Sequence, residues 1–195
     1  MYQMVKAWRS VVALAAAGAA VLGAAADVRA DEGFSFTAEK YSAVPFGMPK
    51  AEVWGMLGGG QTKPGDAAGW CEDDGKSSIL CFTTSSDYAP YGDFSFNADG
   101  KLYSKRHEFL FTPKTPSMTL AKYNTVQLGM TEAQLWSIVS QDSCVPAGER
   151  YPNWPATTGR EVNYYCTAAK GLFPPNASFY ITDGKVTEKY QRALS

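Results

Sequence analysis

The chain of 195 residues has few of the groups that enzymes use, and it contains a single histidine, His107 in "SKRHEFLF". A zinc helix requires a second histidine. A serine hydrolase triad would have to use His107, and no Gly-x-Ser-x-Gly motif is present. The alternation around His107 indicates a strand with the imidazole on the surface of a sheet. The sequence therefore predicts a protein that is not an enzyme.

Cofactor and metal motifs are also missing from the sequence. The glycine run at 58–65, "GGGQTKPG", lacks the Gly-Lys-Ser/Thr ending of a phosphate loop, and Pro64 interrupts the place where a helix should begin. The run is typical of a helix end followed by a loop. We expect neither a cofactor nor a bound metal.

Basic residues are not in excess, since 18 Lys and Arg stand against 19 Asp and Glu. A protein that collects nucleic acid or anionic lipid through its charge needs a positive field. Nucleic acid and membrane surfaces are therefore not expected partners.

The N-terminus has the pattern of a secretory signal peptide. Lys6 and Arg9 precede an apolar run at 11–25 that is shorter than the roughly 20 residues of a membrane span. The small residues around Val28 and Ala30 predict cleavage after Ala30. Removal of residues 1–30 takes three basic and one acidic residue away and leaves 15 against 18, a charge of about −3. We expect a secreted protein with disulfides.

An internal repeat organises the rest of the chain. Residues 38–57, "AEKYSAVPFGMPKAEVWGML", match residues 120–139, "LAKYNTVQLGMTEAQLWSIV", and 96–105 match 180–189. The repeat predicts a tandem duplication, with module 1 at 31–114, module 2 at 115–195 and a boundary in "TPKTPS" at 112–117. Each module owns two cysteines, so the duplication favours the pairs Cys71–Cys81 and Cys144–Cys166 among the three possible pairings.

Each module has the pattern of a helix, a Gly-Met turn, a second helix and then strands. The second helix begins near Pro49 in module 1 and at a Thr131–Gln134 capping box in module 2. An apolar stripe of Val53, Met56 and Leu57 should face the core. The pairs 99–100 and 183–184, both Asp-Gly, indicate two-residue hairpins. The pattern predicts an α+β fold in which helices cover one face of an antiparallel sheet and leave the other face open.

Aromatic residues are plentiful on the expected strands. In 103–111, alternate residues from Tyr103 through Lys105 and His107 to Phe109 and Phe111 should share one strand face. Mixed Tyr, Phe, Trp and Arg surfaces are typical of protein interfaces. The composition therefore favours binding to another protein.

The repeat, the cysteine pairs and the loop containing Asp87 resemble the secreted β-lactamase inhibitory protein family of actinomycetes, of the tandem α+β type and not the propeller type. The most specific stretches are "SDYAPYG" at 86–92, "TLAKYNTVQLGMTEAQLW" at 119–136, "YPNWPATTG" at 151–159 and "FYITDGK" at 179–185. The resemblance implies two four-stranded sheets that form a concave saddle.

The resemblance also implies a set of partner-binding residues. Asp87 matches the loop aspartate that occupies the pocket for the antibiotic's carboxylate, and Tyr88 and Tyr91 match the aromatic positions after it. Leu172 or Phe173 in "GLFPPN" matches the tip of a second loop. The remaining expected contacts are Phe109, Tyr151, Trp154, Tyr180, Tyr190 and Arg192.

The leading hypothesis is an inhibitor, monomeric when free, that binds a class A β-lactamase 1:1 and competes with substrate. One alternative is a homologue without inhibitory action that binds a penicillin-binding protein or a cell-wall component. The other is an enzyme that depends on His107.

Overall fold

The computed structural model describes residues 35–58, 69–84, 86 and 89–195. The predicted signal peptide, Asp87, Tyr88 and the loop expected after Gly58 lie outside these residues. No helix of the described part is both long and apolar enough to cross a membrane.

The same order of elements occurs in both halves of the described chain. The first half contains α1 (Ala38–Ala43), α2 (Lys50–Leu57), β1 (Trp70–Asp73), β2 (Ser78–Phe82), β3 (Tyr91–Phe96) and β4 (Leu102–Glu108). The second half contains α3 (Leu120–Thr125), α4 (Glu132–Ile138), the short 3₁₀ helix η1 (Gln141–Ser143), β5 (Cys144–Arg150), β6 (Glu161–Thr167), β7 (Asn176–Thr182) and β8 (Lys185–Arg192). The α+β prediction is confirmed, and the tandem duplication with its boundary near 115 stays a prediction.

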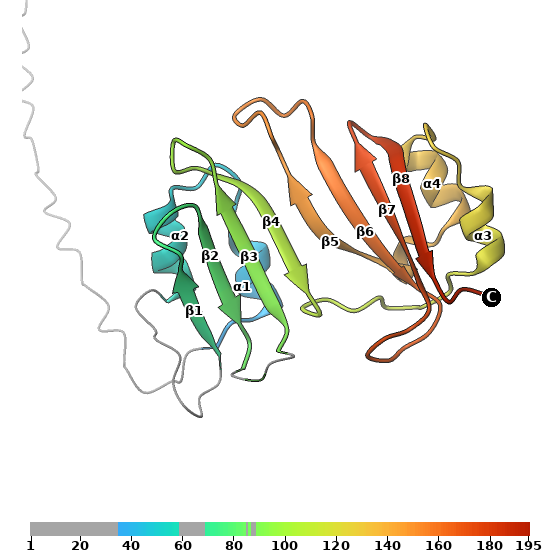
Figure 1. The fold of residues 1–195 in the computed structure, drawn as a ribbon, viewed down its shortest axis with the longest axis horizontal. Helices are drawn as coiled ribbons and strands as arrows, with labels where there is room; N and C mark the ends of the chain where they lie inside the picture. The colour runs from blue at the N-terminus through green and yellow to red at the C-terminus, as the bar shows by residue number, and fades with distance from the viewer. Residues whose placement is uncertain (1–34, 59–68, 85, 87–88) are drawn as a thin grey trace, which may run out of the picture. The chain divides into compact units, whose positions relative to one another are not determined.

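The strands form one antiparallel sheet in the order β1 to β8, with each strand beside its neighbour in sequence (Figure 1). Strands β4 and β5 pair only where Ser104–Arg106 face Gly148–Arg150. The two expected four-stranded sheets are thus joined edge to edge into one. We call this short pairing the β4–β5 junction.

Helix positions follow from local capping. The side chain of Thr37 accepts a hydrogen bond from the backbone N–H of Lys40 at the start of α1, and Thr119 does the same for Lys122 at the start of α3. The Thr131–Gln134 capping box of α4 is confirmed. The second helix, which was expected to begin near Pro49, begins at Lys50, and Pro49 is its N-cap.

The helices pack on one face of the sheet and bury two apolar clusters, one in each half. Figure 1 shows α1 and α2 against β1–β4, and α3 and α4 against β5–β8. Val53 and Leu57 of α2 are fully buried as expected, but Met56 is 45% exposed. Val53 and Leu57 are the buried residues of this short helix, and Trp54 packs against the same cluster. Met56 lies about 100° around the helix from Leu57 and therefore points away from it.

Two lysines tie the sheet to the ends of the helices. Lys105 Nζ of β4 donates to the carbonyls of Tyr41 (3.5 Å), within α1, and of Val44 (2.9 Å), which follows α1. Lys189 Nζ of β8 donates to Tyr123 O (2.9 Å) and also to the carbonyl of Val126 after α3. Each ammonium group therefore satisfies carbonyls that the helix leaves without partners.

The hairpins and disulfides test the local predictions. Asp183 and Gly184, both with positive φ, form the expected two-residue turn between β7 and β8. The β3–β4 connection is longer than predicted, because the Asn97 side chain accepts hydrogen bonds from the backbone N–H groups of Asp99 and Lys101 and closes a five-residue loop. Disulfides link Cys71 to Cys81 and Cys144 to Cys166, and the predicted pairing is confirmed.

Candidate partner-binding face

The face of the sheet opposite the helices carries the side chains that alternate with the core residues, and we call it the open face. The strand registers place one residue from each strand in a continuous row across it. The members of this row are Glu72, Leu80, Asp93, Arg106, Gly148, Asn163, Tyr180 and Glu188. The row combines charged, aromatic and small residues, as protein interfaces do.

An aromatic row lies beside it in the first half. The rings of Trp70 and Phe82 stack at 4.5 Å between centroids, and Tyr91 follows at 5.8 Å from Phe82. Tyr91 was expected among the partner-binding residues, whereas Trp70 and Phe82 were not. The signal for them was in the sequence, because each adjoins a cysteine of the core and strand alternation sends it to the opposite face.

Arg106 and Asp93 form the charged centre of the open face. Arg106 Nη2 lies 3.4 Å from Asp93 Oδ2, and its guanidinium carbon lies 5.8 Å from the centroid of the Tyr91 ring. Burial raises the pKa of Asp93, and Arg106 opposes this shift. The arginine side chain itself is 61% exposed. The pair is held in place while the cation stays accessible.

In the second half, three expected residues lie on the open face. Tyr180 and Tyr190 meet edge to face at 5.8 Å, and Arg192 is exposed near them on β8. The Tyr190 hydroxyl donates to Glu188 Oε2 at 2.8 Å, and this hydrogen bond raises the pKa of Tyr190. Glu188 therefore accepts from Tyr190 on its own strand and lies opposite Tyr180 on β7.

Phe109, Leu172 and Phe173 come together at one end of the sheet. Phe109 follows the last residue of β4 with a φ of +59°, so it leaves the strand that was expected to continue to Phe111. Its ring contacts Phe173 edge to face at 6.4 Å. Leu172 and Phe173 are 60% and 64% exposed. Residues from both halves thus form one apolar projection at the β6–β7 connection.

Tyr151 and Trp154 lie away from this group. Tyr151 packs edge to face on Phe46 at 4.8 Å, and Trp154 lies over Gly47, where an added Cβ would overlap the indole. Phe46 and Gly47 belong to the turn between α1 and α2. These two expected partner contacts therefore link the second half of the chain to the first.

His107 is the clearest error of the sequence interpretation, because its side chain is only 5% exposed. The ring contacts Tyr41 and Phe111, and Nε2 lies 2.8 Å from the carbonyl oxygen of Pro146 in β5. Burial lowers the pKa of His107, and Nδ1 has no partner among the described residues. Alternation groups residues on one face but does not say which face the helices cover, and the histidine face is the covered one.

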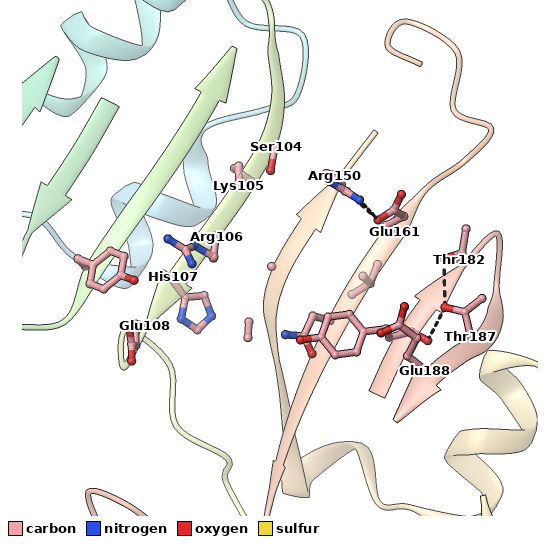
Figure 2. Close-up of a pocket in the computed structure, with 16 residues that line it drawn as sticks. Ser104, Lys105, Arg106, His107, Glu108, Arg150, Glu161, Thr182, Thr187 and Glu188 are labelled. Carbon is pink, nitrogen blue, oxygen red and sulfur yellow. Dashed lines mark hydrogen bonds and ion pairs between the residues drawn. The ribbon is translucent and has the colours of Figure 1, made fainter. Parts of the chain in front are cut away.

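A pocket of about 710 Å³ lies across the β4–β5 junction, and we call it the central pocket. Figure 2 shows Arg106 and Glu108 on the β4 side and Glu161, Thr187 and Glu188 on the opposite side. The other residues at its walls and floor are Tyr91, Ser104, Lys105, His107, Ala147, Gly148, Arg150, Val162, Asn163, Tyr180 and Thr182. The pocket draws on both halves of the chain, so neither half could form it alone.

Clusters of side chains able to hold a metal ion are absent from the part of the chain that the structure describes. The geometry presents a polar and aromatic surface with ionic groups in fixed positions. Such a surface can bind another molecule without making or breaking a covalent bond.

Two comparisons with known proteins give matches. A solved structure from Streptococcus mutans, named "putative beta-lactamase inhibitor protein", is similar with a TM-score of 0.45 and 10% identity, over 83% of this chain and 92% of that chain. The family model described as beta-lactamase inhibitor (BLIP) matches residues 37–166, about two thirds of the chain. The protein therefore belongs to the beta-lactamase inhibitor (BLIP) family.

Proposed function

We propose that the protein is a secreted inhibitor of class A serine β-lactamases that binds one enzyme molecule and competes with its substrate. The observation that carries this proposal is the match of the beta-lactamase inhibitor family to residues 37–166. That segment includes the open face from β1 to β6 and the loop with Asp87. Two disulfides agree with folding in an oxidising compartment outside the cytoplasm.

The competing group in this proposal is Asp87, which lies in sequence between β2 and β3. A pocket that holds a β-lactam carboxylate presents cationic and hydroxyl donors. Hydrogen bonds from such donors to an aspartate are about twice as strong as neutral ones. Tyr88 and Tyr91 would contact the rim of the same pocket, and inhibition would result from occupancy alone.

The open face would supply the contact area that one loop cannot. Stable interfaces bury roughly 1,200–2,000 Å² in total, and a few buried aromatic and arginine anchors carry most of the binding energy. Tyr180, Tyr190 and Arg192 are exposed and adjacent on the open face. The apolar projection of Leu172 and Phe173 would provide a second anchor. Together with Tyr91 these residues are the proposed contacts.

Titration of the protein, produced without residues 1–30, into a panel of class A β-lactamases with a chromogenic β-lactam tests the activity. We expect at least one enzyme to slow stoichiometrically at or below micromolar inhibitor. If none slows, the inhibitor proposal is wrong. Retention of a penicillin-binding protein from envelope extracts by the immobilised protein would then support the alternative of a homologue without inhibitory action.

Replacement of Asp87 by alanine tests its role separately. Removal of one member of a buried charged pair costs about 2–5 kcal/mol, so inhibition should weaken by roughly 30-fold or more. Asp99→Ala is the matched control, because Asp99 is an exposed aspartate in another connection of the same half. If the Asp87→Ala and Asp99→Ala variants inhibit equally, Asp87 does not act as a substrate mimic, and the open face remains the proposed binding surface.

A further inference from the structure

The arginines of the central pocket are already paired within the protein. Arg106 faces Asp93 at 3.4 Å. Arg150 Nε donates to Glu161 at 2.6 Å (Figure 2). Lys105 also lines the pocket, but its ammonium group donates to the carbonyl of Val44 at the C-terminal end of α1. Arg106, Arg150 and Lys105 therefore already have acceptors within the free protein.

Two carboxylates of the pocket have a different environment. Glu108 and Glu188 take part in none of the ion pairs found among the described residues. Each lies beside a tyrosine, since the Tyr190 hydroxyl donates to Glu188 at 2.8 Å and Tyr91 is the direct cross-strand neighbour of Glu108 in the β3–β4 pairing. Figure 2 places the two carboxylates on opposite sides of the pocket. They are oriented acceptors whose charge is not compensated there.

A third acceptor lies in the same pocket. The Oδ1 atom of Asn163, on β6, is buried and has no hydrogen-bond partner within the described chain. An unpaired buried acceptor costs roughly 1–3 kcal/mol. A donor that enters the pocket can recover this cost.

We propose that the central pocket binds a cationic side chain, lysine or arginine, from the surface of the inhibited β-lactamase, an inference that rests on the proposed function. An ammonium or guanidinium group has several N–H donors and no acceptor, which matches a set of oriented acceptors. Complex formation excludes water from the pocket and strengthens the attraction to Glu108 and Glu188. The pocket would thus select enzymes that carry a cation opposite the β4–β5 junction.

Isosteric neutralisation tests the proposal. Glu108→Gln and Glu188→Gln keep the shape of the pocket, and Glu188→Gln keeps an acceptor for the Tyr190 hydroxyl. We expect each to weaken inhibition about tenfold, and the dependence of affinity on salt concentration to decrease. Glu52→Gln, on the exposed side of α2, changes the net charge equally and should leave inhibition unchanged. Asn163→Leu should also weaken inhibition without lowering the thermal midpoint of the free protein.

A double-mutant cycle identifies the partner group. Lysine and arginine residues around the active site of the inhibited enzyme are replaced by methionine one at a time and titrated with wild-type protein and with Glu188→Gln. We expect one enzyme variant on which the Glu188→Gln effect disappears.

The outcomes separate the two proposals. If both glutamine variants inhibit as strongly as the wild-type protein, the central pocket does not bind a cationic side chain, and the inhibitor proposal stands. The same conclusion follows if no enzyme substitution removes the effect of Glu188→Gln. An absence of inhibition by the wild-type protein overturns both.

Discussion

The stability of the protein should fall as the pH is lowered from 8 to 5.5, because of His107. Burial lowers the pKa of this histidine in the folded protein, whereas an unfolded chain titrates near 6.5. The unfolded state therefore takes up the proton first. The stabilising contribution is complete above about pH 6.5 and is lost as the pH falls below it.

The magnitude follows from a single proton. If the folded protein stays neutral at His107, protonation of the unfolded chain reduces the free energy of unfolding by at most about 1.4 kcal/mol at pH 5.5. The structure gives the reason for neutrality, because Nε2 is 2.8 Å from Pro146 O while Nδ1 has no acceptor among the described residues. The sequence contains no other histidine that could account for the effect.

Urea unfolding at pH 8, 7, 6 and 5.5, with disulfides intact, measures this loss. The matched variant is His107→Gln, which keeps a donor for the Pro146 carbonyl but does not titrate. We expect the wild-type protein to lose stability toward pH 5.5 and the variant to change little. A wild-type protein whose stability is constant, or a variant with the same slope, would contradict the assignment to His107.

Three further predictions concern contacts between elements, each measured by urea unfolding. Lys105→Met and Lys189→Met should each cost about 1.5–3 kcal/mol, since each removes charged donors from helix-end carbonyls; losses below 0.5 kcal/mol in both would contradict this. Substitution of both cysteines of a disulfide by serine should cost about 2.7 kcal/mol at Cys71–Cys81 and about 3.4 kcal/mol at Cys144–Cys166, whose separations are 10 and 22 residues. A larger loss at Cys71–Cys81 than at Cys144–Cys166 would argue against the chain-entropy reasoning. Trp154→Ala should cost about 1–3 kcal/mol through two aromatic contacts, and an unchanged midpoint would show that the contact with the first half is not stabilising.

Features set by neighbouring residues could be predicted from the sequence. The Thr131–Gln134 capping box, the Asp183-Gly184 turn and the order of helices and strands depend on contacts within a few positions. The disulfide pairing followed from the repeat, because each pair joins adjacent strands of the same half.

Features set by distant residues could not be predicted. The β4–β5 junction depends on pairing across the boundary between the two halves. The residue pattern of β4 does not indicate that β5 is the neighbouring strand. The burial of His107 and the position of Tyr151 and Trp154 depend on which side the helices and the α1–α2 turn occupy. The central pocket exists only after the strands are assembled, so its carboxylates and Asn163 gave no signal in the sequence.

The most direct test of the proposed function is the dependence of inhibition on substrate concentration. The protein is titrated into an inhibited class A β-lactamase at several concentrations of a chromogenic β-lactam below and above KM. Competition at the active site predicts that the apparent inhibition constant rises linearly with substrate concentration. An apparent constant that does not change with substrate would contradict occupancy of the active site.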